Sequence, residues 1–271
     1  MKQKMNKYIS NIVKVLSRPE LSILPANIAF FFVLAIIPFL TIMILIASYF
    51  SISVDLVIDL INEFLPPEIS NFLVEVVSGK GFDKSVGIFN IIAFFLATNS
   101  TYSVIMISNS LYKVKGSGMV KDRVKAIILL LVIVLLFLFL IVVPMFGDKI
   151  LNLIHDIKLL SSFGDEIILM FNVIKWPFTF LMIYFNIKFI YVFAPDKQIE
   201  SKTTSVGAFF TTIIWMIATA IFSFYIKYFA SYDIIYGNLS SMIILMMWLL
   251  ILSYVFVLGM VINTTDFDEK D

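Results

Sequence analysis

Residues 126–144 read AIILLLVIVLLFLFLIVVP, an apolar run that contains no charged residue. A helix needs roughly 20 mostly apolar residues to cross the hydrocarbon core of a bilayer, and this run has that length. A transmembrane β-barrel would instead contain shorter segments in which apolar and polar residues alternate. The run therefore predicts a membrane-spanning α-helix and favours an all-α fold.

The composition of the whole chain also indicates a membrane protein. Of its 271 residues, 61% are hydrophobic and only 14% are charged, and the mean hydropathy is +1.00. A soluble domain is about 45–50% apolar and about 25% charged, so a soluble fold of this size could not bury the surplus. This excludes a cytosolic enzyme and a disordered chain.

Five further stretches have the length and apolar character of a membrane span. We predict one six-helix membrane domain over residues 1–271, which makes the chain a polytopic, multi-pass protein. The predicted spans lie at about 27–50, 86–112, 126–146, 168–194, 204–230 and 239–263.

The distribution of Lys and Arg predicts the orientation of these spans. Cations concentrate in the N-terminal tail and in the loops that follow the second and fourth spans, whereas the other loops are poor in them. Short loops rich in Lys and Arg stay in the cytoplasm. Both termini are therefore expected on the cytoplasmic side.

Residues 51–85 predict an amphipathic helical hairpin on the outer side of the membrane. Asp55, Asp59 and Glu63 recur every four residues among apolar neighbours and share one helical face. Pro66 and Pro67 then separate this stretch from a second amphipathic one, and residues 147–167 resemble a shorter version. The hairpin either lies on the bilayer surface or serves only as a lid that packs on the bundle.

The second predicted span carries a stripe of polar residues. At about 100° per residue they fall within roughly a third of the helix circumference. Polar side chains that face lipid are costly, so the stripe either lines a polar pathway or forms hydrogen bonds between helices. Together with residues of the fifth and sixth spans, the candidate pathway-lining residues are Asn99, Tyr102, Ser103, Asn109, Thr211 and Asn263.

Other residues are expected to shape the helices. Pro38 lies in the middle of the first span, where the loss of a backbone hydrogen bond predicts a kink, and broken helices often bind cargo in transporters. Small residues allow helices to approach closely. The residues expected in such helix packing are Gly207, Gly237, Trp248 and Gly259.

Few residues could support catalysis or bind a cofactor. The chain contains no Cys and a single His, His155, in a predicted outer loop. These residues predict neither a metal site nor a nucleophile, so we expect no enzyme activity and no cofactor. The phosphate-binding loop of an ATP-driven pump is absent from the sequence. The net charge of +1 is too small to indicate a nucleic-acid partner.

Several stretches, taken in order, resemble one known family. They are AFFFVLAIIP at residues 29–38, NSLY at 109–112 and YVFAP at 191–195, followed by Gly207, Trp215, Tyr225, Gly237, Trp248, Gly259 and Asn263. This ordered set is similar to the YihY/BrkB family of bacterial inner-membrane proteins. The chain has Ala35 where the family often has Ser, and Val261 where it often has Glu.

The resemblance implies a six-span protein of the bacterial cytoplasmic membrane. Members of the family have been labelled virulence or serum-resistance factors, and some are associated with export of lipid or envelope precursors. An older label, ribonuclease, conflicts with these residues, because a metal-dependent nuclease needs several His and carboxylate side chains around one site.

We therefore expect a transporter or translocator of a lipid or envelope precursor. Membrane lipids and a lipid-like cargo are the expected partners, and a homo-oligomer or an envelope protein would also fit. The alternative is a non-transporting scaffold or partner subunit of an envelope assembly. A third hypothesis is a membrane enzyme that acts on lipids. It has less support, because the sequence contains few groups of residues that could form a catalytic site.

Overall fold

The computed structural model describes residues 23–35, 55, 58–59, 61–62, 66–78, 86–135, 164–229 and 236–267. Their regular structure is helical throughout, as the sequence predicts. The labelled α-helices are α4 (Pro67–Ser78), α5 (Val86–Leu111), α7 (Gly164–Phe193), α8 (Ser205–Phe229) and α10 (Ser240–Phe267), and the 3-10 helix η2 (Gly237–Leu239) precedes α10. Two further helices cover Ile23–Ala35 and residues 119–135.

Two of the described helices are long and apolar enough to cross a membrane, namely Ser205–Tyr228 in α8 and Ser240–Thr264 in α10. Shorter apolar segments cover Ile23–Ala35 and Pro177–Phe193. The number of spans stays a prediction, although α5 and α8 begin and end within two residues of the predicted spans. Pro38, His155 and most of residues 36–65, 79–85 and 136–163 lie outside the described residues.

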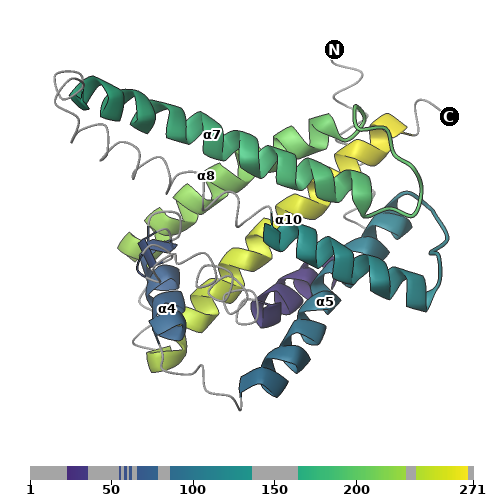
Figure 1. The fold of residues 1–271 in the computed structure, drawn as a ribbon, viewed down its shortest axis with the longest axis horizontal. Coiled ribbons are helices and arrows are strands. Elements are labelled where there is room, and N and C mark those ends of the chain that lie inside the picture. Colours follow the sequence, from purple (N-terminus) through teal and green to yellow (C-terminus); the bar gives the residue numbers. More distant parts are fainter. Residues whose placement is uncertain are drawn as a thin grey trace.

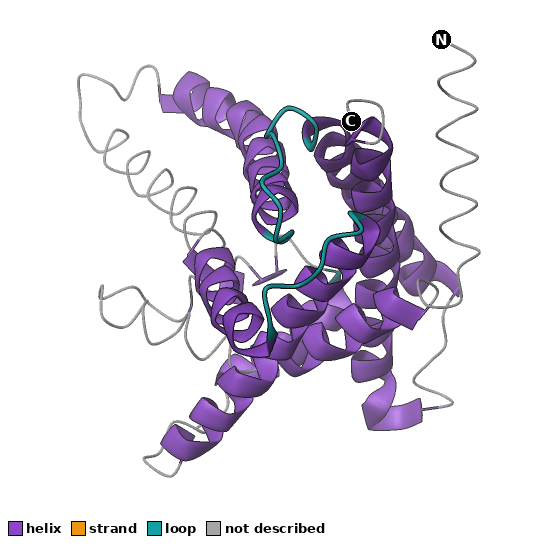
Figure 2. Ribbon diagram, turned by 90° about the vertical axis from the view of Figure 1, so that its right-hand side faces the viewer, coloured by secondary structure: helices purple, strands orange, loops and turns teal. Residues whose placement is uncertain are grey.

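The helices form a bundle in which α10 is central. It packs against α8, α4 and α5, while α7 packs against α8 (Figure 1). The two described loops, residues 112–118 and 194–204, lie at the same end of the bundle (Figure 2). We call this the loop end, and the charge distribution predicts that it faces the cytoplasm.

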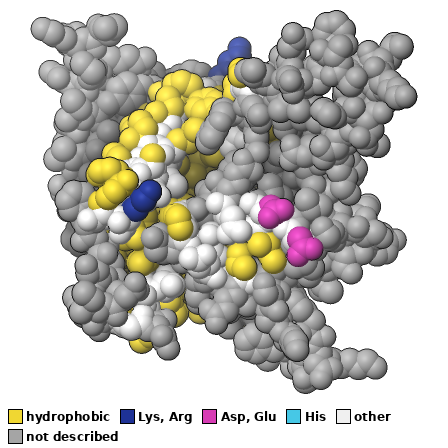
Figure 3. Space-filling view, turned by 90° about the vertical axis from the view of Figure 1, so that its left-hand side faces the viewer, with side chains coloured by type: hydrophobic (Ala, Val, Ile, Leu, Met, Phe, Trp, Pro, Cys, Tyr) yellow, Lys and Arg dark blue, Asp and Glu magenta, His cyan; other side chains and the backbone are white. Residues whose placement is uncertain are grey.

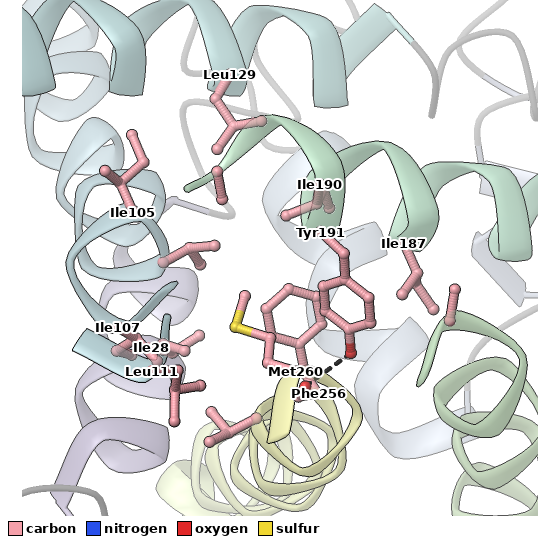
Figure 4. Packing of buried hydrophobic residues seen from close by; sticks show 14 of the residues in the cluster. Ile28, Ile105, Ile107, Leu111, Leu129, Ile187, Ile190, Tyr191, Phe256 and Met260 are labelled. Atoms are coloured by element: carbon pink, nitrogen blue, oxygen red, sulfur yellow. Dashed lines mark hydrogen bonds between the residues drawn. The ribbon is translucent and has the colours of Figure 1, made fainter. Parts of the chain in front are cut away.

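The buried apolar core lies near the loop end. It joins the Ile23–Ala35 helix, the last half of α5, residues 126–133 of the 119–135 helix, the end of α7, the start of α8 and the last half of α10 (Figure 4). Fully or almost fully buried members include Ile105, Leu129, Ile187 and Met260. Since the end of α7, the start of α8 and the last half of α10 meet in this core, these three helices run in alternate directions, which is the arrangement that short loops between spans require.

The outside of the bundle is also apolar. Large side chains such as Ile221, Val173 and Tyr228 remain more than 60% exposed, and hydrophobic side chains follow one described face of the molecule (Figure 3). A soluble monomer rarely exposes apolar patches of more than a few hundred Å². Such a surface suits a bilayer, where the helical backbone satisfies its own polar groups.

Candidate functional site

The contact between α8 and α10 depends on two glycines. A Cβ atom added at Gly259 would overlap Thr211 Oγ1 and the hydroxyl of Tyr191, and one added at Gly207 would overlap the Gly259 carbonyl and Asn263. The two helices are therefore close enough for backbone to meet backbone, as small residues permit. Gly207 and Gly259 both lie at this contact between α8 and α10.

Buried hydrogen bonds join α7, α8 and α10 at this crossing. The Tyr191 hydroxyl donates to the Phe256 carbonyl at 2.7 Å, and it lies 2.8 Å from Thr211 Oγ1 (Figure 4). The backbone N–H of Gly207 donates to Asn263 Oδ1 at 2.8 Å. Thr211 and Asn263 are fully buried, so their oxygen atoms serve contacts between helices at these points.

Two tryptophans extend the same crossing. Trp215 Nε1 of α8 donates to the Leu252 carbonyl of α10 at 2.8 Å, and Trp248 Nε1 of α10 donates to Thr219 Oγ1 of α8 at 3.2 Å. Gly237 differs from this group. It is exposed, its φ is +51°, and a Cβ there would contact nothing within 4 Å, so its backbone conformation rather than close packing favours glycine.

A second polar site lies at the loop end, where α5 stops. Lys113 has a φ of +55°, and the N–H groups of Lys113 and Val114 donate to the carbonyls of Ser110 and Asn109. This is a Schellman motif, which ends a helix and satisfies its last carbonyls. The motif turns the chain into the 112–118 loop directly above the side chain of Asn109.

Asn109 binds Asp196 with both ends of its amide. Asn109 Nδ2 donates to Asp196 Oδ2 at 2.7 Å, and the Asp196 N–H donates to Asn109 Oδ1 at 2.8 Å. The Ser117 N–H donates to the same carboxylate at 3.1 Å. We call these residues, together with Lys125, the Asp196 junction. It connects α5 to the loop that joins α7 and α8.

Lys125 completes the Asp196 junction from the 119–135 helix. Its Nζ lies 2.7 Å from Asp196 Oδ1 and also donates to the carbonyls of Ala194 and Pro195 at 2.9 and 2.8 Å. Burial alone raises the pKa of Asp196, but the hydrogen bonds from Lys125, Asn109 and Ser117 outweigh it and hold this pKa below its ordinary value. The carboxylate is therefore ionised and paired.

A third polar site, which we call the Arg123 cradle, lies where the 119–135 helix crosses α5. Arg123 Nη1 donates to Asn99 Oδ1 at 2.6 Å and to Thr98 Oγ1 at 3.2 Å. Its guanidinium carbon lies 4.8 Å from the centre of the Phe95 ring and 5.1 Å from that of Tyr102. Both distances fit cation–π contacts. One turn further on, Thr101 Oγ1 donates to the Ala126 carbonyl at 2.8 Å.

The predicted pathway residues thus separate into two groups. Asn109, Thr211 and Asn263 are buried in contacts between helices, and Ser103 is also buried. Asn99 and Tyr102 are only partly buried. The structure brings these last two together with Arg123 and does not bring the six residues into one lining. Whether any of them lines a pathway stays a prediction.

Sequence reasoning missed the partners of these residues. Arg123 and Lys125 belong to the cation-rich stretch after the second predicted span, which served only to predict orientation. No individual role was assigned to Asp196 or Tyr191 from the sequence. A local signal existed for Asp196, because an acid directly after the helix end at Ala194–Pro195 is a ready partner for nearby basic residues. Within the described ranges, no group of three or more His, Cys, Asp or Glu residues could hold a metal ion.

The chain is similar to known proteins along most of its length. Residues 12–270 match the family described as Virulence factor BrkB. A Bacillus subtilis protein named YfkH, described as ribonuclease-like, is 28% identical over 88% of this chain and 87% of its own length.

Partial matches add further relatives. A UPF0761 membrane protein of Haemophilus influenzae (strain PittEE) is 31% identical, with 32% of each chain covered. One of Coxiella burnetii is 26% identical over 41% of this chain and 43% of its own. The matched region therefore covers less than half the length of each of these two relatives. No solved structure gives a significant match.

Proposed function

The chain belongs to the virulence factor BrkB family, and on that premise we propose that it translocates a lipid or envelope precursor across the bacterial cytoplasmic membrane. In this proposal the protein is multi-pass, both termini are cytoplasmic, and the charged loops at the loop end face the cytoplasm. Membrane lipids surround the protein and also provide the cargo that it moves.

The Arg123 cradle is the observation that supports this proposal. Arg123, Asn99 and Tyr102 are partly buried, and the Phe95 ring beside them is 52% exposed. The cradle therefore presents a cation and polar groups at the outer surface of the bundle rather than in its core. Such groups are costly beside lipid and are usually retained for function.

The proposed path follows the partly buried side of α5 rather than the whole predicted stripe. Asn109, Thr211 and Asn263 already bond to protein groups, so moving a headgroup past them would first break those bonds. Asn99 also bonds to protein, at Arg123 Nη1, but the cradle borders the surroundings of the bundle, so a headgroup can pass it with that bond in place.

We also propose that the protein is not an enzyme. The name of the Bacillus relative refers to a ribonuclease-like protein, but nuclease chemistry based on metals needs several convergent ligands. This chain has one His and no Cys. A nuclease assay with purified protein and RNA would contradict this proposal if turnover persisted after removal of contaminating nucleases.

Reconstitution into vesicles tests translocation. Fluorescent phospholipids would be bleached from outside, and ion leak would be recorded in the same vesicles. Wild-type protein should make inner-leaflet lipids accessible without leak. Asn99→Leu should slow this movement by about tenfold, which corresponds to roughly 1.4 kcal/mol of barrier height.

The matched control is Ser223→Leu, a polar-to-Leu change at a partly buried position of α8, away from the cradle. It should retain the wild-type rate. Lipid movement that stays at the level of protein-free vesicles, from protein with a cooperative melting transition, would refute translocation of those lipids.

A partner-subunit role is the second candidate, and a specific observation favours it. Three of the six predicted pathway residues, namely Asn109, Thr211 and Asn263, bond to other helices or to the loop between them, as a scaffold requires. Crosslinking from Asp59, an exposed residue of the predicted outer hairpin, would then capture one reproducible envelope protein. Translocation without any such partner would exclude this role as the main one.

A further inference from the structure

Arg123 retains unused hydrogen-bond donors. A guanidinium has five N–H groups in a planar fork, and the side-chain acceptors that the structure gives Arg123 are Asn99 Oδ1 and Thr98 Oγ1, both bound by Nη1. Across the described part of the chain, no acceptor is bonded to Nε or Nη2. Within the described ranges, the edge that binds two oxygens at once therefore has no partner.

No carboxylate neutralises this guanidinium within the described ranges. The adjacent acid, Asp122, forms no ion pair with it there, and the Asp196 carboxylate is paired with Lys125. A partly buried cation without a counter-ion is unfavourable in apolar surroundings. An anion from outside the chain would remove that penalty.

The surroundings of Arg123 hold the fork in place. Phe95 and Tyr102 lie two turns apart on α5, and the guanidinium contacts both rings. Asn99, between them, binds Nη1 at 2.6 Å. Because these contacts fix the plane of the guanidinium, little side-chain entropy remains to be lost when the free edge binds a ligand.

We propose that the Arg123 cradle binds the phosphate group of an anionic lipid in the cytoplasmic leaflet. The free Nε–Nη2 edge matches the spacing of two phosphate oxygens, and the exposed Phe95 ring offers apolar surface for an acyl chain. Arg123 is in the second turn of the 119–135 helix, which is predicted to enter the bilayer from the cytoplasmic side, where anionic headgroups gather. This inference rests on the proposed function, since it names the headgroup class of the cargo.

Native mass spectrometry of the full-length protein in detergent tests this binding directly. The probes are phosphatidylglycerol, which carries an anionic phosphate, and diacylglycerol, which has the same acyl chains and no phosphate. Wild-type protein should prefer phosphatidylglycerol. Arg123→Gln should weaken the binding of phosphatidylglycerol by about tenfold or more, as expected for the loss of charge-assisted hydrogen bonds, and should leave the binding of diacylglycerol almost unchanged.

Two variants separate this site from a general effect of charge or folding. Lys121→Gln removes one positive charge from an exposed position on the same helix, and it should change the affinity by less than about twofold. Arg123→Lys retains the charge and loses the fork, so its affinity should fall between those of wild type and Arg123→Gln. If Arg123→Gln does not fold, Arg123→Lys becomes the decisive variant.

The outcomes decide between the possible sources of phosphate. Equal losses in Lys121→Gln and Arg123→Gln, or no loss in either Arg123 variant, would overturn the inference. Displacement of the lipid by millimolar inorganic phosphate would overturn the lipid as the source. Arg123-dependent binding in a protein that moves no lipid would refute translocation and leave the headgroup site standing.

Discussion

Asp196 shows how a single side chain at the loop end can hold three elements together. Its carboxylate binds Asn109 of α5, the Ser117 N–H of the following loop and Lys125 of the 119–135 helix. Its side chain is only 5% exposed and that of Lys125 is 19% exposed, so the pair is shielded from water. Hydrogen bonds to charged groups contribute about 1.5–3 kcal/mol each when shielded in this way.

We predict that Asp196→Asn lowers the free energy of unfolding by about 1–3 kcal/mol near neutral pH. Because the folded-state pKa of Asp196 lies below its ordinary 3.8, the stabilisation is fully present above that value. It is lost as pH falls through the folded-state pKa. The melting temperature of the wild type should therefore fall more steeply than that of Asp196→Asn as the pH drops below about 4.

Asp55→Asn provides the matched control, because Asp55 is exposed. It should follow the wild-type curve at every pH. Tryptophan fluorescence during heating in detergent measures both variants. Parallel curves for wild type and Asp196→Asn down to low pH would contradict the assigned role of Asp196.

These residues also indicate what can be read from sequence. The stripe on α5 could be predicted, because positions on one helix face follow from the 3.6-residue repeat. Its partners could not, because Asn109 and Asp196 are 87 positions apart and local periodicity contains no information on that pairing. Charge counting located Arg123 between the second and third predicted spans, but it did not indicate that Arg123 lies inside a helix and binds Asn99.

Among whole elements, the α8–α10 pair holds the bundle together by close approach. The sequence predicted an apolar helix at both places, because long apolar runs indicate spans directly, although α10 continues to Phe267, beyond the predicted end at residue 263. It also suggested Gly207 and Gly259 as packing residues. It could not indicate that Tyr191 of α7 would insert its hydroxyl between the two helices, since this depends on the three-helix arrangement.

We predict that Gly259→Ala destabilises the protein by about 1–3 kcal/mol, the usual cost of overpacking. The new methyl group would overlap Thr211 Oγ1 and the Tyr191 hydroxyl, so α8 and α10 must separate. Thermal unfolding in detergent measures the loss. Adding Thr211→Ala should restore part of the stability, because the two changes act at one contact and are not additive.

The control for this pair is Ala220→Val, which adds volume at an exposed position of α8. It should alter the melting temperature by much less than Gly259→Ala. A Gly259→Ala protein as stable as wild type would mean that the two helices can separate at no cost, contrary to a crossing fixed by backbone contact.

For the molecule as a whole, the direction of insertion is the property that both proposals share. The bundle places the 112–118 and 194–204 loops at one end (Figure 2), and both loops contain exposed lysines. The positive-inside rule assigns that end to the cytoplasm. A headgroup site at Arg123 faces the cytoplasmic leaflet only if this orientation holds.

The absence of native cysteine allows a direct test of the orientation. Single substitutions would be made at the exposed positions Lys115, Lys202 and Asp59 and treated with a membrane-impermeant maleimide in intact cells. We predict that Asp59→Cys reacts at once, whereas Lys115→Cys and Lys202→Cys react only after permeabilisation. The cysteine-free parent controls for background labelling. The reverse pattern would place the loop end outside, and the Arg123 cradle would then face the outer leaflet, which would refute uptake of the lipid from the cytoplasmic side.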